Sequence, residues 1–371
     1  MKRLLYFLII YSTVSCEVKI NDSDIFAGEI KTIDDTVKTI VELEPHEIIL
    51  DGITYGYPAV YDTLMFFYNS KLPDRYYSIF NLKTGKHIGD FCPKGQGPGE
   101  ARVVSLIYQF YRENGELKTL LLAPLNYKIA VWNISASIAG NKTVWDFVPY
   151  DWRKDRDEIC ANVTVRLNSK EFICQITPLF LDPEDTYCTN STVLHYEKRT
   201  LYSDSLIRKY TIFKQSLKHT YSDRLLGSWD CVKPDGSKIV QFMIHMWQIN
   251  TIDIETGKVT AYRPVEKFPG FSYLANFMEP HEQLPGYFIW AVSNDKYVLA
   301  LYCNGLKGEK RKNNLVVYVF DWDCNLLKKV KLKNESIYYD LALDNDNNLY
   351  TVAPNDEGET ICRYDLKSTG L

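Results

Sequence analysis

A glycine-rich segment at residues 95–100 has the clearest potential for binding chemistry. It contains three glycines and a glutamate, and closely spaced glycines can present backbone amides to an anion. A phosphate-binding loop would need a following helix and, in the Walker case, a Lys-Ser/Thr pair. Here Pro98 interrupts the run and a strand-like segment follows, which disfavours a phosphate loop.

Two interpretations of this segment stay open. The glycines allow an irregular backbone where the chain crosses between sheets, or their amides line a central channel and bind an anion or a peptide carboxylate. Under the second interpretation Glu100 adds a charged contact. The candidate ligand-binding residues are then Gly95, Gln96, Gly97, Gly99 and Glu100.

A second candidate is the acidic and amide-rich run at residues 344–348. Alternating side-chain oxygens from Asp344, Asp346 and Asn348 resemble part of a calcium loop, because a hard cation prefers oxygen ligands. The run lacks the central glycine and the distant bidentate glutamate of an EF-hand. A plain hairpin turn is therefore the favoured interpretation, and a metal site is the alternative.

No arrangement of residues indicates a catalytic site. No HxH or HExxH pairing occurs, a Gly-x-Ser-x-Gly elbow does not occur, and the acidic residues are too many to nominate a glycosidase pair without geometry. The histidines are His46, His87, His195, His219, His245 and His281. We predict no catalytic residue and no cofactor.

Aromatic residues outside the strand-like repeats are the last candidates. Tyr55 and Tyr57 flank a glycine, and on a loop such rings could stack on sugar rings or hold a peptide. The alternative role is packing between sheets. Further examples are Trp145, Trp152, Trp229 and Trp290. We add Tyr55 and Tyr57 to the candidate ligand-binding residues.

The N-terminus has the pattern of an export signal. Lys2 and Arg3 precede about a dozen mainly apolar residues, too few to span a bilayer. The signal ends at Thr-Val-Ser-Cys, which resembles a bacterial lipobox with Cys16 as the lipidated residue, although Thr13 departs from the usual Leu. An ordinary signal with a chance cysteine is the alternative. We expect residues 1–15 to be a signal peptide and Cys16 to anchor the chain in the outer membrane, periplasmic or surface-exposed.

Composition excludes some partners and favours strands. The chain has 371 residues, a net charge of -4 and 14% aromatic residues, so nucleic acid is an unfavoured partner and β-structure is favoured. The basic runs 307–312 and 328–333 fit solvated loops or edge strands. Eight cysteines besides Cys16 match no CxxC signature, and we expect them to be buried thiols or local disulfides.

Two patterns recur six times and predict the elements that position these residues. The first is a strand ending in an aromatic and a polar residue, often with Thr-Gly; its copies are residues 77–85, 129–134, 193–197, 251–257, 317–321 and 361–366. The second is a turn before each strand, at residues 73–74, 114–115, 168–169, 235–236, 294–295 and 347–348. The pattern predicts an all-β fold, a six-bladed β-propeller of four-stranded antiparallel blades. A pair of β-sandwiches is the rival.

Closure of the ring requires a strand from the N-terminal region. Residues 36–43 alternate in strand fashion, so we expect them to complete the last blade beside residues 361–366. Residues 16–35 would then be a polar tether between lipid and ring. The predicted domain is residues 36–371.

The segment Phe-Cys-Pro-Lys-Gly-Gln-Gly-Pro-Gly-Glu at residues 91–100 also resembles the Gly-x-Gly-Pro-Gly-Glu signature of six-bladed, TolB-like propeller lipoproteins of Bacteroidetes. The resemblance covers residue 36 to the C-terminus and rests on this segment and the blade ends. It implies the propeller fold and an envelope location but little chemistry. Ala101 and Arg102 depart from the aromatic residue expected after the motif.

Two functional classes follow. The leading one is a non-catalytic binding or scaffolding propeller at the cell envelope, with a protein or glycan partner and no contact with the membrane beyond the lipid. The alternative is a propeller enzyme acting on glycans, of the lyase or glycosidase kind. Clustered, mutually perturbed carboxylates at the axis would favour the enzyme.

Overall fold

The computed structural model describes residues 19–36, 39–52, 54–150, 159–178, 194–215, 217, 225–265, 268, 270–277, 283–306, 315–333, 340–355 and 358–371. The predicted signal peptide, Cys16 and the basic run 307–312 lie outside the described residues.

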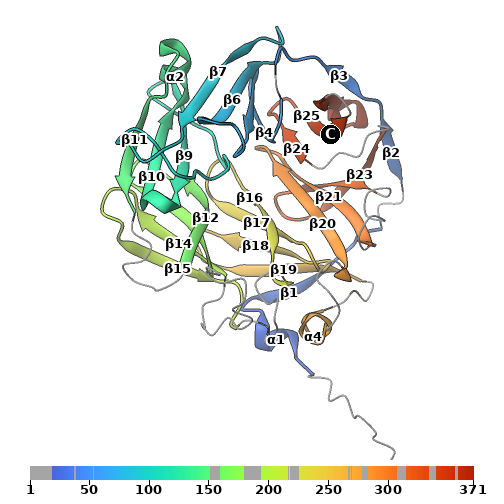
Figure 1. Ribbon diagram of the computed structural model, residues 1–371. Coiled ribbons are helices and arrows are strands. Elements are labelled where there is room, and N and C mark those ends of the chain that lie inside the picture. The colour runs from blue at the N-terminus through green and yellow to red at the C-terminus, as the bar shows by residue number, and fades with distance from the viewer. Residues whose placement is uncertain are drawn as a thin grey trace, which may run out of the picture.

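Six antiparallel sheets surround a central axis, which confirms the six-bladed propeller of four-stranded blades (Figure 1). Blade 1 contains β4 (Tyr57–Tyr61), β5 (Leu64–Tyr68), β6 (Arg75–Asn81) and β7 (His87–Pro93). Blade 2 contains β8 (Tyr111–Glu113), β9 (Glu116–Ala123), β10 (Lys128–Asn133) and β11 (Trp145–Pro149). Blade 3 contains β12 (Ile159–Arg166), β13 (Glu171–Pro178), β14 (His195–Thr200) and β15 (Leu206–Thr211).

The second half of the ring has the same plan. Blade 4 contains β16 (Ser228–Val232), β17 (Lys238–Met243), β18 (Ile249–Asp253) and β19 (Val259–Pro264). Blade 5 contains β20 (Gly286–Ser293), β21 (Tyr297–Leu306), β22 (Val316–Asp321) and β23 (Leu326–Leu332). Blade 6 contains β24 (Asp340–Leu343), β25 (Asn348–Asn355), β26 (Gly358–Asp365) and the N-terminal β3 (His46–Ile48). Short helices are α1 (Asp22–Ile25), η1 (Pro124–Asn126), α2 (Ile134–Gly140), α4 (Phe271–Ala275) and η4 (Leu366–Thr369).

Each of the six predicted repeat strands falls on the third strand of a blade, at β6, β10, β14, β18, β22 and β26. The polar residue that ends the pattern caps the next turn: Asp253 Oδ1 accepts hydrogen bonds from the backbone amide and hydroxyl of Thr256, each at 2.7 Å. Gly257 follows with a φ of 74°, which a glycine adopts without steric cost. Five of the six predicted turns join first and second strands, and the turn at 73–74 joins β5 to β6.

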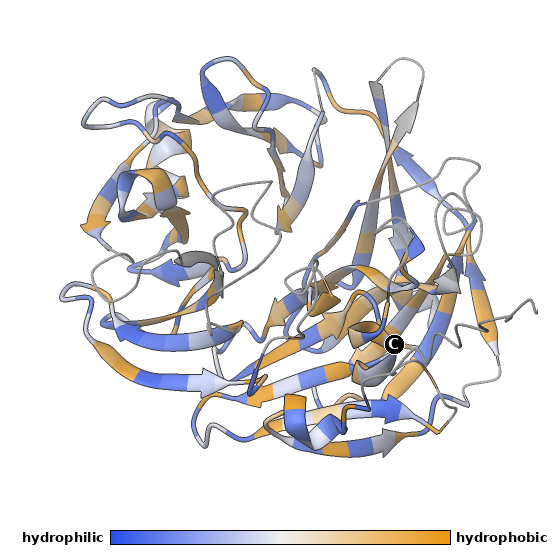
Figure 2. Cartoon of the chain, turned by 60° about the horizontal axis from the view of Figure 1, so that its bottom comes forward, coloured by the Kyte–Doolittle hydropathy of each residue, from blue (hydrophilic) through white to orange (hydrophobic). Residues whose placement is uncertain are grey.

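The hydrophobic core is divided among the junctions between blades. Within the described residues, six clusters of buried apolar side chains occur, one between each pair of neighbouring blades. In β9, for example, Leu120 and Leu122 pack towards blade 3 whereas Leu121 packs towards blade 1. Figure 2 shows hydrophobic and hydrophilic residues alternating along the strands. Because both faces of each blade are covered, a blade depends on its neighbours for stability.

The predicted closing strand was wrong in its location. Strand β2 (Ile40–Leu43) pairs in parallel with β23 of blade 5, and β3 pairs with β26 to close blade 6. Leu43 of β2 packs in the core between blades 5 and 6 with Val330 and Leu332 of β23. At the surface, Lys331 of β23 and the following Lys333 lie 3.7 Å and 3.4 Å from Glu42, and such exposed ion pairs contribute little to stability.

The predicted tether also differs from the structure. Strand β1 (Glu29–Ile33) pairs in parallel with β19, and Ile25 and Phe26 are each only 1% exposed in the core between blades 3 and 4. The described part of residues 16–35 is thus packed on the ring. Segments β1, β2 and β3 follow the outer edges of blades 4, 5 and 6 in turn before the chain enters blade 1 (Figure 1). No described helix is long and apolar enough to cross a membrane.

Cys92, Cys174, Cys231 and Cys324 are free, buried thiols, and Cys303 and Cys362 are buried as well. Burial in apolar surroundings raises the pKa of the Cys92 thiol well above its ordinary value, because the thiolate would lose its hydration. For the four free cysteines, the structure thus favours buried thiols over local disulfides.

Candidate functional site

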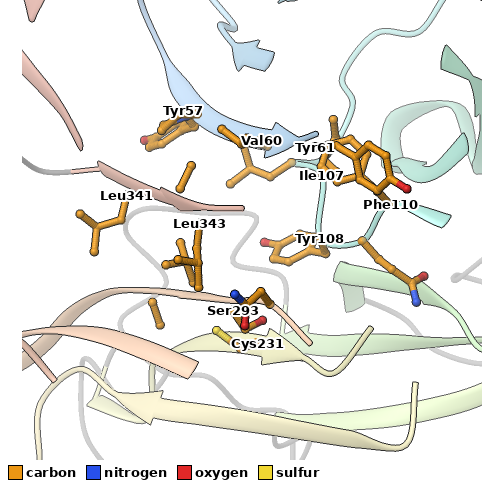
Figure 3. A pocket seen from close by; sticks show the side chains of 18 of the residues that line it. Tyr57, Val60, Tyr61, Ile107, Tyr108, Phe110, Cys231, Ser293, Leu341 and Leu343 are labelled. Carbon is orange, nitrogen blue, oxygen red and sulfur yellow. The ribbon is translucent and has the colours of Figure 1, made fainter. Parts of the chain in front are cut away.

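A cavity of about 210 Å³ lies at the axis of the propeller (Figure 3). Its walls come from the innermost strands of blades 1, 4, 5 and 6 and from residues 106–110, which precede β8 in blade 2. The cavity has two rims. We call the rim where the innermost strands begin the Tyr57 rim, and the rim where they turn into their second strands the hairpin rim.

Three aromatic rings from different blades form the wall at the Tyr57 rim. Tyr57 of β4 stacks on Trp290 of β20 with the ring centroids 5.6 Å apart and the planes 6° apart. The ring centroids of Trp290 and Trp229 of β16 lie 4.3 Å apart. The indole nitrogen of Trp290 donates to the Leu341 carbonyl oxygen at 3.0 Å. Trp290 is 8% exposed whereas Tyr57 is 45% exposed. The inner rings are thus held rigidly and Tyr57 covers them at the surface.

Tyr108 occupies the middle of the cavity. Figure 3 shows its ring between Tyr57 on one side and Phe110 on the other. Burial, and then the negative charge of Asp230, raise the pKa of Tyr108, so its hydroxyl stays protonated. This hydroxyl makes no hydrogen bond to another described residue, and it is therefore available to a ligand.

Asp230 of β16 forms part of the wall beside Tyr108. Its carboxylate accepts hydrogen bonds from Tyr196 and Gln175 of blade 3, from the Gln241 amide at 3.2 Å and from the Ser228 hydroxyl at 2.7 Å. Burial raises the pKa of Asp230 despite these donors. The carboxylate thus has hydrogen bonds but, among the described residues, no cationic partner in direct contact.

The hydrogen bonds of Asp230 continue across blade 4 to the outer edge. Asp230, Gln241 and Asn250 are neighbours in register on β16, β17 and β18. The Gln248 amide donates to Asn250 at 2.6 Å, and Arg263 donates to Gln248 at 2.7 Å. Arg263 also forms an ion pair with Asp22 of α1. This chain of polar side chains joins the cavity wall to the N-terminal helix.

Two carboxylates lie beside the cavity where blade 6 meets the start of blade 1. Burial raises the pKa of Asp340 to about 7. Burial, and then the nearby charge of Asp340, raise the pKa of Glu359 to about 7, while a hydrogen bond from the Gly56 amide opposes the shift. Neither residue lines the cavity itself. The pair is able to hold a proton at neutral pH.

The glycine-rich crossover lies away from the axial cavity. Its residues do not line the cavity. They belong to the segment that connects β7 to blade 2. The Gly97 amide donates to Glu100 Oε2 at 2.9 Å, and the Gly95 amide donates to the Ala101 carbonyl oxygen at 3.0 Å. Gly95 has a φ of 153°, and a Cβ there would overlap the Glu100 carboxylate. Glu100 thus binds the loop's own backbone, as the interpretation of an irregular crossover predicts.

Residues 344–348 form the turn between β24 and β25. Asp344 Oδ1 accepts from the amides of Asp346 and Asn348, and its Oδ2 accepts from the Asn348 side chain and the Tyr350 hydroxyl. The side chain of Asp346 is 81% exposed. These four hydrogen bonds are typical of a capped hairpin turn. A plain hairpin is the interpretation that the sequence analysis favoured. The described residues contain no group of three or more His, Cys, Asp or Glu placed to hold a metal.

Of the predicted aromatic candidates, Tyr57, Trp229 and Trp290 line the cavity, whereas Tyr55 is exposed beside it and does not. Trp145 lies on β11, where its indole donates to the Gly99 carbonyl oxygen at 3.1 Å. Trp152 lies outside the described residues. The structure brings Tyr57 together with the two tryptophans, and it separates all three from the glycine-rich crossover.

Sequence reasoning missed Tyr108 and Asp230. Tyr108 precedes a short strand in an irregular run, so no periodicity indicated that it faces the axis. A signal for Asp230 did exist, because Gln241 and Asn250 are polar residues inside apolar strands and both are fully buried. Buried amides need partners, and such residues indicate a polar network.

Comparisons with known proteins support the fold. The chain is similar to a solved structure of a DUF4221 protein from Bacteroides vulgatus, with a TM-score of 0.57 and 13% identity over 88% of this chain and 97% of the other. It is also similar to a Bacteroides fragilis protein described as exported, with a TM-score of 0.52 and 12% identity over 91% and 98% of the two chains. Comparisons with protein families and with curated proteins found no match.

Proposed function

We propose that this protein is an exported propeller, anchored at the bacterial cell envelope through Cys16, that binds a small ligand in its axial cavity without transforming it. The observation that carries the proposal is the cavity wall, where Tyr57, Trp229 and Trp290 present aromatic surface and the Tyr108 hydroxyl has no partner among the described residues. A concave, mainly apolar site with few polar groups is typical of small-molecule binding.

The size and the rims of the cavity support a small ligand. Its volume of about 210 Å³ is below the roughly 300–1,000 Å³ of sites for drug-sized molecules. A larger protein or glycan partner would contact the Tyr57 rim from outside, where Tyr55 and Tyr57 are 48% and 45% exposed. The similarity to a Bacteroides protein described as exported is consistent with the proposed location.

A pair of matched variants tests the site. Ala291→Phe adds a ring to the cavity wall, whereas Ala139→Phe adds the same ring on the exposed side of α2, away from the axis. In a thermal-shift screen of small molecules, a ligand of the cavity raises the melting temperature of the wild type and of Ala139→Phe but not of Ala291→Phe. A ligand-induced shift that survives in Ala291→Phe places binding elsewhere and contradicts the proposal.

The anchor is tested separately from the ligand site. Cys16→Ser removes the thiol that would carry the lipid, so the protein should move from the membrane fraction to the soluble periplasmic or secreted fraction. Unchanged membrane association of the variant would contradict lipid anchoring at this residue.

A propeller enzyme acting on glycans is the second candidate, and Asp340 with Glu359 is the observation that favours it. A carboxyl group with a pKa of about 7 is able to act as a general acid near neutral pH. We would measure turnover of envelope glycans by wild type, Asp340→Asn and Glu359→Gln. Turnover that both substitutions abolish would support the enzyme, and turnover that is absent or unaffected would exclude a role for this pair.

A further inference from the structure

The charges around the axial cavity have one sign. Two of the described residues that line it are acidic, Asp62 at the hairpin rim and Asp230 in the wall, and none is Lys, Arg or His. Arg112 donates to the hydroxyl of the lining residue Tyr61 at 3.1 Å, but it does not itself line the cavity. A ligand in the cavity therefore experiences a negative potential, strengthened by the low-dielectric walls.

Asp230 is the more closely surrounded of the two acidic residues, since other side chains donate four hydrogen bonds to its carboxylate. All four hydrogen bonds that it accepts come from neutral groups: Tyr196, Gln175, Gln241 and Ser228. Gln241 and Tyr196 are themselves fully buried, so they leave no room for a protein cation at this end of the carboxylate. An enclosed carboxylate without a cation is costly, and a positive charge placed in the adjacent cavity offsets that cost.

The aromatic walls favour the same sign of charge. Trp290 contacts both Trp229 and Tyr57 at one rim. Figure 3 shows the ring of Tyr108 between Tyr57 and Phe110. The faces of aromatic rings carry partial negative charge and attract cations, most strongly where water is excluded. An anion would meet these ring faces and two acidic side chains together, so the cavity disfavours phosphate and carboxylate ligands.

From this combination we infer that the axial cavity binds a small organic cation, a ligand with a substituted ammonium group that rests against the tryptophan and tyrosine rings near Asp230. The inference rests on the proposed function and narrows it to one chemical class. A neutral sugar could use the same rings through stacking, but it gains nothing from the carboxylates. Charge is therefore the property that separates the two ligand classes.

Three probes of one shape and different charge test the inference. Choline has a trimethylammonium head, and 3,3-dimethylbutan-1-ol and 3,3-dimethylbutanoate have a tert-butyl head of the same shape. The charges of the three molecules are plus one, zero and minus one, and the negative charge is on the carboxylate at the far end. Binding to the full chain is measured by calorimetry or by ligand-observed NMR. We expect choline to bind about tenfold more tightly than the alcohol and the anion to bind least.

Variants show whether binding occurs at the inferred groups. Ala291→Phe should abolish choline binding and Ala139→Phe should not. Tyr108→Leu removes an aromatic face and should weaken choline binding severalfold, whereas Tyr108→Phe keeps the face and should weaken it much less. This pair avoids Asp230, whose substitution would disturb the hydrogen bonds between blades 3 and 4.

The outcomes separate the inference from the proposed function. Equal binding of choline and the alcohol, both sensitive to Ala291→Phe, would overturn the cation inference and leave the cavity as a small-ligand site. Binding of none of the three probes in the cavity would also overturn the cation inference, and the broader screen would then decide the proposed function by itself. Preferential binding of choline that is lost in Ala291→Phe and weakened in Tyr108→Leu would support the cation inference.

Discussion

The axial cavity and the glycine-rich crossover both contain groups suited to ligand binding, but they differ in where those groups are directed. In the crossover, Glu100 accepts from the Gly97 amide and the Gly95 amide donates to Ala101, so the polar groups bind each other. In the cavity, the Tyr108 hydroxyl and the ring faces of Tyr57 and Trp229 are directed towards space that a ligand can enter.

This difference shows that a segment can bind a ligand only through groups that have no partner within the protein itself. Glycines make a backbone able to approach an anion, yet the same freedom lets a loop fold onto its own carboxylate. Inner strands of a propeller converge on the axis but cannot fill it completely, and side chains from several blades remain exposed to the cavity. The polar groups of the crossover are therefore used within the loop, whereas the proposed binding site lies in the cavity.

The largest expected effect concerns the cavity wall. Trp290→Ala should lower the free energy of unfolding by about 3–5 kcal/mol, because it removes a nearly buried ring that contacts Tyr57, Trp229 and the Leu341 carbonyl. Urea unfolding followed by far-ultraviolet circular dichroism measures the change. A loss below about 1 kcal/mol would show that the ring is a loosely held ligand contact rather than a rigid wall.

The second prediction concerns the crossover. Gly95→Ala should lower the free energy of unfolding by about 2–3 kcal/mol, because the new Cβ would overlap the Glu100 carboxylate and the backbone conformation is unfavourable for alanine. Gly99→Ala is the matched control: a Cβ there meets no atom within 4 Å, and the change should stay within about 0.5 kcal/mol. Equal effects at both positions would contradict the self-bonded crossover.

The third prediction is a pH dependence beside the cavity. The folded-state pKa of Asp340 is raised from 3.8 to about 7, so its contribution to stability is complete below about pH 4 and is lost as the pH rises through 7. Relative to Asp340→Asn, the wild type should lose roughly 2–3 kcal/mol between pH 5 and pH 8. Asp346→Asn, at an exposed residue of the same blade, should show a constant difference over this range.

The smallest expected effect tests whether the Tyr108 hydroxyl, unlike the polar groups of the crossover, has no partner within the protein. Tyr108→Phe should change the free energy of unfolding by less than about 0.5 kcal/mol, because the hydroxyl has no hydrogen-bond partner among the described residues. Thermal and urea unfolding of the variant measure this. A loss above about 1 kcal/mol would mean that the hydroxyl has a structural partner and is not free for a ligand.

Local patterns predicted much of the blade architecture. The third strand of every blade ends in residues whose side chains cap the next turn, and such caps depend on neighbours within four residues, as Asp253 and Thr256 show. Alternation in the strands predicted burial on both faces, because a period of two places successive side chains on opposite sides. The second function of Tyr57, as a cover for Trp290, was not predictable in this way.

The closing of the ring and the site itself could not be predicted locally. Residues 36–43 were correctly expected to include a strand, but the sheet edge that they join is set by contacts with β23, which is distant in the chain, as Leu43 packing on Val330 and Leu332 shows. Likewise Tyr57, Tyr108, Asp230 and Trp290 come from four blades. Their meeting depends on the angle between blades, which no segment encodes alone.

By itself, the sequence determined that this protein is a six-fold repeat of strands with capped turns, because propensity, alternation and turn chemistry act over a few residues. Only the tertiary structure decided which of its candidate groups are free. Hydrogen-bond partners such as Glu100 for Gly97, and Tyr196 for Asp230, are set by packing, and packing decides whether a polar group is satisfied or faces a cavity.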